Sequence, residues 1–153
     1  VFHPVEVMLR LRQTGGVTDE AMLVAALLPD VVEETGTTLA EVQERFGENA
    51  AQLVAELTRR EPSPSETEGL DKDALWRLRA DMLIEDVAEM SPRAMMVKLC
   101  DRISNLEEAG RTRRGKKVVR YVWQSERFLE TIPRTVHPVL WDELKATVKR
   151  VGG

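Results

Sequence analysis

Apolar residues recur at intervals of three and four along most of this chain, which is the period of an amphipathic α-helix. Clear sets are Val5, Met8 and Leu9, then Met22, Leu23, Ala26 and Leu27, then Leu39, Val42 and Phe46. Alternating runs of β-branched residues, which would indicate strands, are few. We therefore expect an all-α fold in which each helix buries its apolar face in a shared core.

Polar and glycine residues between these sets indicate where the helices begin and end. Gly15-Gly16 closes the first predicted helix, and Thr18 or Asp19 opens the second. Thr38 and Glu41 have the spacing of a capping box, in which the hydroxyl and the carboxylate each bond an end of the helix. A third helix is therefore expected from about residue 38 to Gly47.

The second half of the chain divides in the same way. Two prolines, serines and acids with little to bury predict a loop over residues 60–71. Ser91-Pro92 has the N-cap and first-turn residues of a new helix. The remaining predicted helices cover about 49–59, 72–90, 91–109, 116–131 and 138–151.

An acidic cluster follows the apolar run at residues 24–28. Asp30, Glu33 and Glu34 lie three and four residues apart, so on a helix they share one face and repel one another. Carboxylates at the end of an apolar run are also costly to desolvate unless something pairs with them. Either the helix leaves the core here and the cluster is solvated, or the carboxylates hold a cation.

Composition indicates one soluble domain, residues 1–153, with a substantial core. The net charge of −4 argues against nucleic acid as a partner. The single cysteine fits a reducing compartment, and no apolar run approaches the roughly 20 residues that span a bilayer. We therefore expect a cytoplasmic protein without a membrane partner, while its oligomeric state does not follow from the pattern.

Three ordered segments carry a family resemblance. Residues 24–38 read VAALLPDVVEETGTT, residues 97–106 read VKLCDRISNL, and His3-Pro4 stands at the start. Together they resemble the HD-domain hydrolases of the RelA/SpoT type, which remove the 3′-pyrophosphate of the nucleotide ppGpp. Weaker echoes at Phe46-Gly47, 53–54 and 57–59 extend the resemblance to about residue 130. It implies an irregular helical bundle of the HD type and a guanosine tetraphosphate-like small-molecule ligand.

The resemblance also implies a metal site. The family holds a divalent ion, typically manganese, with two histidines and two aspartates, and the matching ligands here are His3, Asp30 and Asp101. Pro29 stands where the second histidine belongs and has no donor atom. We therefore expect Mn²⁺ to bind weakly or not at all. Inside a helix, Pro29 would also cost a backbone hydrogen bond and bias Leu28 away from helical angles.

Two glutamates match the family's catalytic pair. By resemblance, Glu33 and Glu34 position and deprotonate the attacking water. A solvated helix end is the alternative interpretation for both.

The remaining candidates concern substrate binding. Asn105 follows Asp101 by four residues, on the same helical face, and matches a residue that contacts the sugar or its phosphates. Lys98 could bind phosphate or only solvate the surface. Arg102 is a third candidate, with a salt bridge to Glu33 or Asp30 as its alternative.

Other conspicuous residues read as structural. His137 precedes Pro138 and is expected to open the last helix, while Cys100 is expected to pack in the core. The tryptophans and adjacent methionines are also expected to be core residues, namely Trp76, Trp123, Trp141, Met95 and Met96.

His3 needs packed neighbours to act as a ligand, so an additional helix is expected upstream of it.

Two functions follow from these observations. The first function is a ppGpp 3′-pyrophosphohydrolase with an impaired metal site, and retention of His3, Asp30, Glu33, Asp101 and Asn105 favours it. The second is a degenerate HD domain that acts as a nucleotide-binding or regulatory module, and Pro29 divides the two. HD phosphohydrolases of other nucleotides are a third, minor interpretation.

Overall fold

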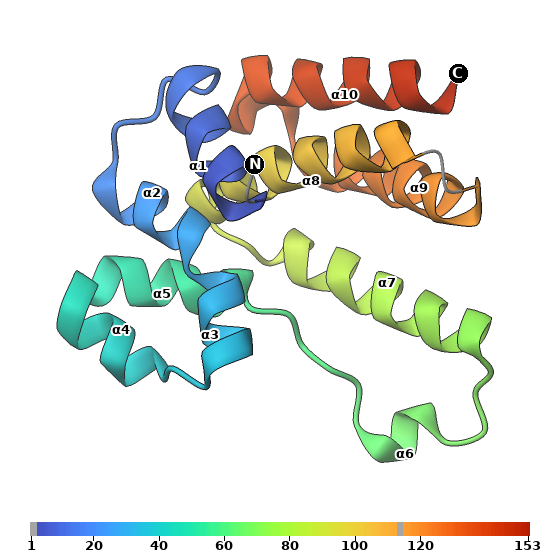
Figure 1. Ribbon diagram of the computed structural model, residues 1–153, viewed down its shortest axis with the longest axis horizontal. Coiled ribbons are helices and arrows are strands. Elements are labelled where there is room, and N and C mark those ends of the chain that lie inside the picture. Colours follow the sequence, from blue (N-terminus) through green and yellow to red (C-terminus); the bar gives the residue numbers. More distant parts are fainter. Residues whose placement is uncertain (1–2, 113–114) are drawn as a thin grey trace.

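The computed structural model describes residues 3–112 and 115–153, with Asp30 described in its backbone only, and it is helical without strands over these ranges (Figure 1). The prediction of an all-α fold is confirmed. The elements in chain order are α1 (His3–Gln13), α2 (Glu20–Leu27), α3 (Pro29–Thr35), α4 (Leu39–Phe46), α5 (Glu48–Leu57), α6 (Pro64–Thr67), α7 (Lys72–Ala88), α8 (Pro92–Thr112), α9 (Gly115–Thr131), the 3₁₀ turn η1 (Arg134–Val136) and α10 (Pro138–Gly152).

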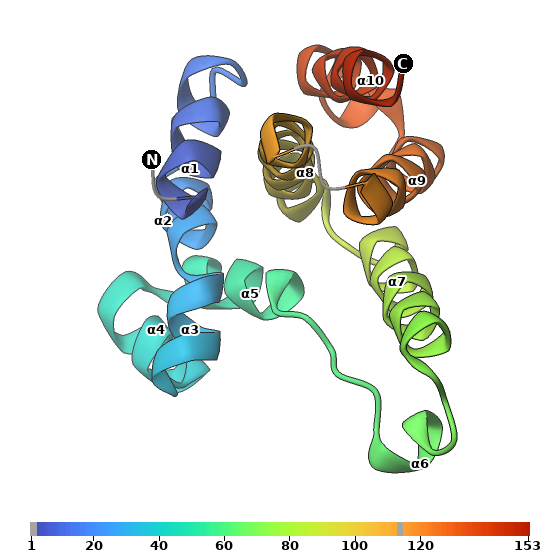
Figure 2. The same cartoon turned by 45° about the vertical axis from the view of Figure 1, so that its right-hand side comes forward.

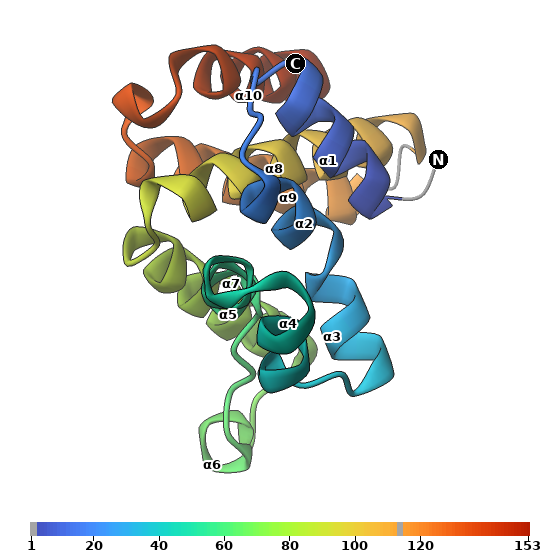
Figure 3. The same ribbon diagram turned by 90° about the vertical axis from the view of Figure 1, so that its left-hand side faces the viewer.

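Helix α8 is the centre of the bundle. It packs against α1, α2, α5, α9 and α10, with α1 and α2 on one side and α9 and α10 on the other (Figures 2 and 3). Its inner side chains are inaccessible to solvent, including Leu99, Cys100, Ile103 and Leu106. Burial of each large apolar side chain contributes roughly 1.5–3 kcal/mol to the stability of the fold. Helix α8 is therefore fixed in place by its neighbours on nearly every side.

Several helix ends form as expected. The Asp19 carboxylate caps α2 by accepting from the amide of Met22 at 3.2 Å. Thr38 and Glu41 form the full capping box of α4. The His137 Nδ1 caps α10 by accepting from the amide of Leu140, as its predicted structural role requires.

Pro29 corrects one expectation. It does not lie inside a helix: α2 ends at Leu27, and Pro29 is in the first turn of the separate helix α3. Leu28 is in the right-handed helical region at φ −91° and ψ −25°, contrary to the predicted bias. The first amides of a helix have no partner within it, so a proline here loses no helical hydrogen bond.

The segment predicted as a loop over 60–71 contains one helical turn, α6. Ser63 and Glu66 form a second capping box, and Pro64 follows the cap. Apart from this turn the segment lacks regular structure, and it extends away from the other helices before returning to α7 (Figures 1 and 2).

The tryptophans follow the prediction only in part. Trp141 packs against the core and donates its indole N–H to the carbonyl of Ile132 at 2.9 Å. Trp76 and Trp123 are half-buried between α7 and α9, with ring centroids 5.8 Å apart in an edge-to-face pair. Arg77 and Arg120 stack on these two rings, so the pair lies outside the aliphatic core.

The sulfur residues match the prediction. Cys100 is fully buried, and this burial raises the pKa of its thiol to about 12. Met95 is buried, and Met96 packs partly against the same core. None of the described helices combines the length and hydropathy that crossing a membrane requires.

Candidate functional site

The first turn of α1 meets the middle of α8. The imidazole Nε2 of His3 lies 2.9 Å from Oδ1 of Asp101, and the side chains are 29% and 25% exposed. α1 packs along α8 through Val7 and Leu11, which are buried in the same core. Two of the predicted ligands therefore converge.

Asp101 is surrounded by polar groups from its own helix. Asn105 donates to Oδ2 of Asp101 at 3.4 Å, and the Lys98 ammonium lies 3.8 Å from the same oxygen. Burial disfavours the ionised carboxyl, but Lys98, the hydrogen bond from His3 and Arg102 together outweigh it and hold the pKa of Asp101 well below its usual range. Asp101 is therefore an anion at neutral pH.

Burial affects Lys98 in the opposite direction. It lowers the pKa of the ammonium, and the charge of Asp101 offsets part of this effect. Lys98 is only 13% exposed, so it is not the solvating surface lysine of the alternative interpretation.

A cavity of about 280 Å³ opens over these side chains. Pro29 and Glu33 line it from α3, so one member of the acidic cluster, Glu33, reaches the same space as His3 and Asp101. The other lining residues include Lys98, Asn105, Arg59 and Tyr121.

Two of the predicted site residues, Glu34 and Arg102, do not line this cavity. Glu34 is exposed and does not line this cavity. Arg102 is buried and donates to Oε1 of Gln124 at 2.9 Å, and the salt bridge with Glu33 that was its alternative interpretation is absent from the described part of the chain. Asp30 lies in the first turn of α3, and its side chain lies outside the described residues.

Arg59 and Tyr121 are lining residues that sequence reasoning did not select. Arg59 belongs to the weak family match at residues 57–59, and this match is the sequence feature that could have indicated it. Tyr121 is the only tyrosine of the chain, and it reaches the cavity from α9. No local motif marks it, because α9 meets α8 through tertiary packing.

The described residues fit a divalent ion in part. His3 and Asp101 supply one nitrogen and one oxygen donor at the same point, a mixture that suits several divalent transition metals. Within the described side chains, which exclude Asp30, there is no group of three or more histidine, cysteine or acidic residues placed to hold an ion. Pro29 borders the cavity without offering a donor.

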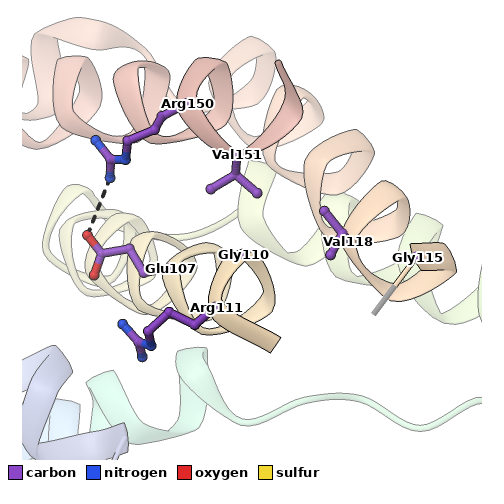
Figure 4. Close-up of a pocket in the computed structure, with 7 residues that line it drawn as sticks. All are labelled: Glu107, Gly110, Arg111, Gly115, Val118, Arg150 and Val151. Carbon is purple, nitrogen blue, oxygen red and sulfur yellow. Dashed lines mark ion pairs between the residues drawn. The ribbon is translucent and has the colours of Figure 1, made fainter. Parts of the chain in front are cut away.

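A larger cavity lies elsewhere in the described part of the chain. A groove of about 800 Å³ separates the ends of α8 and α10 and the start of α9, with Glu107 and Arg150 paired at 3.6 Å across it (Figure 4). Val118 and Val151 line it as well. It contains none of the predicted site residues, so size alone does not locate the function.

The helical bundle brings His3 of α1 against Asp101 of the central helix α8, and this arrangement can be compared with known protein families. The model of the HD domain family matches residues 1–125, and the chain belongs to this family.

Curated relatives support the same placement. A Homo sapiens protein named guanosine-3′,5′-bis(diphosphate) 3′-pyrophosphohydrolase MESH1 is 38% identical over 110 residues, which are 71% of this chain and 55% of that protein. An Aquifex aeolicus guanosine-3′,5′-bis(diphosphate) 3′-pyrophosphohydrolase is 34% identical over 113 residues, 70% of this chain and 14% of that protein. The chain thus spans about half the length of the MESH1 relatives it matches.

Solved structures agree on the fold. One is described as a metazoan ortholog of SpoT that hydrolyzes ppGpp. It superimposes with a TM-score of 0.78 at 27% sequence identity, and the match covers 98% of this chain and 80% of that chain. A Listeria monocytogenes EGD-e protein has a TM-score of 0.76 at 24% identity, covering 99% of this chain and 96% of its own, and supports the fold alone. The predicted HD-type bundle is confirmed.

Proposed function

We propose that this chain is an HD-type domain of a metal-dependent phosphohydrolase that removes the 3′-pyrophosphate of a guanosine 3′,5′-bis(diphosphate)-like nucleotide, with an impaired metal site. The contact between His3 and Asp101 carries the proposal, because it joins two segments of the family resemblance at one cavity. The names of the relatives supply the substrate class.

His3, Asp101 and, by resemblance, Asp30 are the proposed metal ligands. A divalent ion, which the family resemblance indicates is manganese, would supply positive charge opposite the phosphates and a water of lowered pKa. Pro29 offers no donor at the position of the family's second histidine, which supports weak binding of the ion. Two carboxylates and one imidazole leave a coordination shell that solvent must complete.

The proposed reaction gives roles to three residues that line the cavity, Glu33, Lys98 and Asn105. Water adds to the phosphorus of the 3′-pyrophosphate, the bond from phosphorus to the ribose 3′ oxygen breaks, and that oxygen gains a proton. Glu33 lines the cavity and is the better placed of the two glutamates to accept the proton of the water. Lys98 places a cation beside the phosphates, and Asn105 can turn its amide toward the sugar.

The alternative is a nucleotide-binding or regulatory module without turnover. Its supporting observation is Pro29 itself, which borders the cavity where a ligand is expected. A degenerate site of this kind would keep the polar lining and lose the chemistry.

The test is to incubate the chain with ppGpp and excess Mn²⁺ and to separate guanosine 5′-diphosphate and pyrophosphate from substrate. Slow turnover that Asp101→Ala abolishes supports the hydrolase. Binding of ppGpp without any product, in this chain and in a variant with restored metal binding, would contradict hydrolysis and support the module.

A further inference from the structure

A second cavity of about 490 Å³ adjoins the candidate site. It lies between α7, α8 and α9, and it shares Arg59, Asn105 and Tyr121 with the first cavity. The two spaces therefore meet at these three side chains. Trp76 adds a second aromatic wall from α7.

The lining of this second cavity is basic. Its charged lining residues, within the described part of the chain, are all cations: Arg59, Arg79, Arg102, Lys116, Lys117 and Arg120. The chain as a whole has a net charge of −4, so this concentration of positive charge is local. Clustered cations against low-dielectric walls attract multiply charged anions.

Some of these cations have carboxylate partners at the rim. Asp73 binds Lys116 at 2.7 Å and also binds Arg120, and Glu61 binds Arg79 at 3.2 Å. Asp73 and Glu61 are exposed and are not lining residues. They neutralise the outer edge and leave the inner part of the cavity positive.

Arg102 is the strongest indication of a ligand. It is only 2% exposed, and its guanidinium makes one hydrogen bond within the described residues, to Gln124, while its Nε has no partner. The rings of Tyr121 and Phe128 lie 5.2 and 4.6 Å from it, but no carboxylate of the described residues lies within ion-pair distance. Burial lowers the pKa of Arg102, and the charge of Asp101, which lies beyond ion-pair distance, offsets only part of this effect. A buried cation without a close ion pair is costly, and a bound anion would reduce that cost.

We propose that the second cavity is a binding subsite for a diphosphate or polyphosphate group, centred on Arg102 and bordered by Lys117 and Arg59. Guanidinium and ammonium groups bind phosphate oxygens through charge-assisted hydrogen bonds, and their number here suits more than one phosphate. The group is either a free inorganic anion or the far end of a nucleotide that also occupies the first cavity. Only the nucleotide source rests on the proposed function.

Isothermal titration of the chain with inorganic pyrophosphate, in the presence of EDTA, tests the subsite without turnover or metal. Lys117→Gln removes an exposed lining cation and is expected to weaken binding at least tenfold, as is Arg102→Gln. Lys149→Gln is the matched control, because Lys149 is an exposed lysine on α10 that lines no described cavity, and it is expected to bind like the unmodified chain.

A variant that binds pyrophosphate more tightly controls for misfolding, because a misfolded chain would lose binding and not gain it. Asp73→Asn frees Lys116 and Arg120 from their carboxylate and is expected to tighten pyrophosphate binding several-fold. Absence of pyrophosphate binding would overturn the proposal, and so would binding that Lys117→Gln leaves unchanged. Binding that Lys98→Gln abolishes while Lys117→Gln leaves it intact would place the anion in the first cavity and would also overturn it.

Competition identifies the source of the phosphate group. If the subsite holds the far end of a nucleotide, pyrophosphate and ppGpp compete in EDTA, and Lys117→Gln weakens both. If it holds a free anion, both ligands bind together and Lys117→Gln weakens pyrophosphate alone. Either result supports the phosphate subsite, and neither depends on whether ppGpp is hydrolysed.

Discussion

His3 Nε2 and Asp101 Oδ1 lie 2.9 Å apart although 98 positions separate the two residues in the sequence. The contact joins the start of α1 to the middle of the central helix α8. Lys98 and Asn105 approach the other carboxylate oxygen from within α8. The pairing of an imidazole with an ionised carboxylate beside a cavity is the feature on which the proposed metal site rests.

Asp101 is also the counter-charge of a buried lysine. Asp101→Asn is expected to lower the free energy of unfolding by about 2 kcal/mol, somewhat less than the roughly 3–5 kcal/mol for a fully buried pair, because Lys98 remains buried as a cation. Urea unfolding at neutral pH measures the change. Adding Lys98→Met to Asp101→Asn is expected to restore part of the loss, and a double variant less stable than Asp101→Asn would contradict the pairing.

The two candidate glutamates are expected to differ. Glu33→Gln removes a carboxylate that lines the cavity and is expected to lower kcat by about 10²–10⁴-fold. Glu34→Gln changes an exposed side chain outside that lining and is expected to cost much less. Both are measured on ppGpp in a Pro29→His background, where turnover is expected to be faster. Equal losses, or a larger loss for Glu34→Gln, would refute the assignment of Glu33.

Asp19 links the start of α2 to α8 and should make stability depend on pH. Burial opposes its charge, but the amide of Met22 and the guanidinium of Arg93, 2.6 Å away, together lower the pKa of Asp19. A lowered pKa means that the stabilisation is present above the ordinary aspartate value of about 3.9 and is lost as the pH falls through the folded value.

Asp19→Ala is therefore expected to cost about 1 kcal/mol at pH 7, mainly through the lost cap. Unfolding curves from pH 7 to pH 2.5 measure how this difference changes. It should shrink below about pH 4, and a difference that grows on acidification would contradict the sign.

Pro29 should contribute little to stability. It occupies the first turn of α3, where its missing N–H costs no helical bond, so Pro29→Ala is expected to change the free energy of unfolding by less than about 1 kcal/mol. A thermal or urea unfolding curve decides this. A gain near 3 kcal/mol would show instead that the proline interrupts a helix that would otherwise be continuous.

Local signals accounted for much of the fold. The capping box of Thr38 and Glu41 predicts α4, and the family segments predict that His3 and Asp101 lie together, as they do in the structure. Pro29 was misjudged because the same proline either breaks a helix or starts one, and the sequence does not show which carbonyls remain paired. The choice depends on how α2 and α3 pack.

Tertiary contacts explain the rest. Arg102 is a candidate for substrate binding, and its side-chain partner Gln124 lies on α9, 22 positions away. Tyr121 reaches both cavities only because α9 packs on α8. Arg102 lies in the family segment at 97–106, but no motif marks Tyr121 or the packing of α9 on α8, so the second cavity could not be predicted from the sequence.

The most direct test of the central claim compares ppGpp hydrolysis in excess Mn²⁺ by the unmodified chain, by Pro29→His and by Pro29→Ala. If His3, Asp30 and Asp101 form a metal site that lacks one ligand, Pro29→His should raise the rate by orders of magnitude, because it restores an imidazole donor. Pro29→Ala should leave the rate low. Fast hydrolysis by the unmodified chain, or no gain in Pro29→His despite bound metal, would contradict the account.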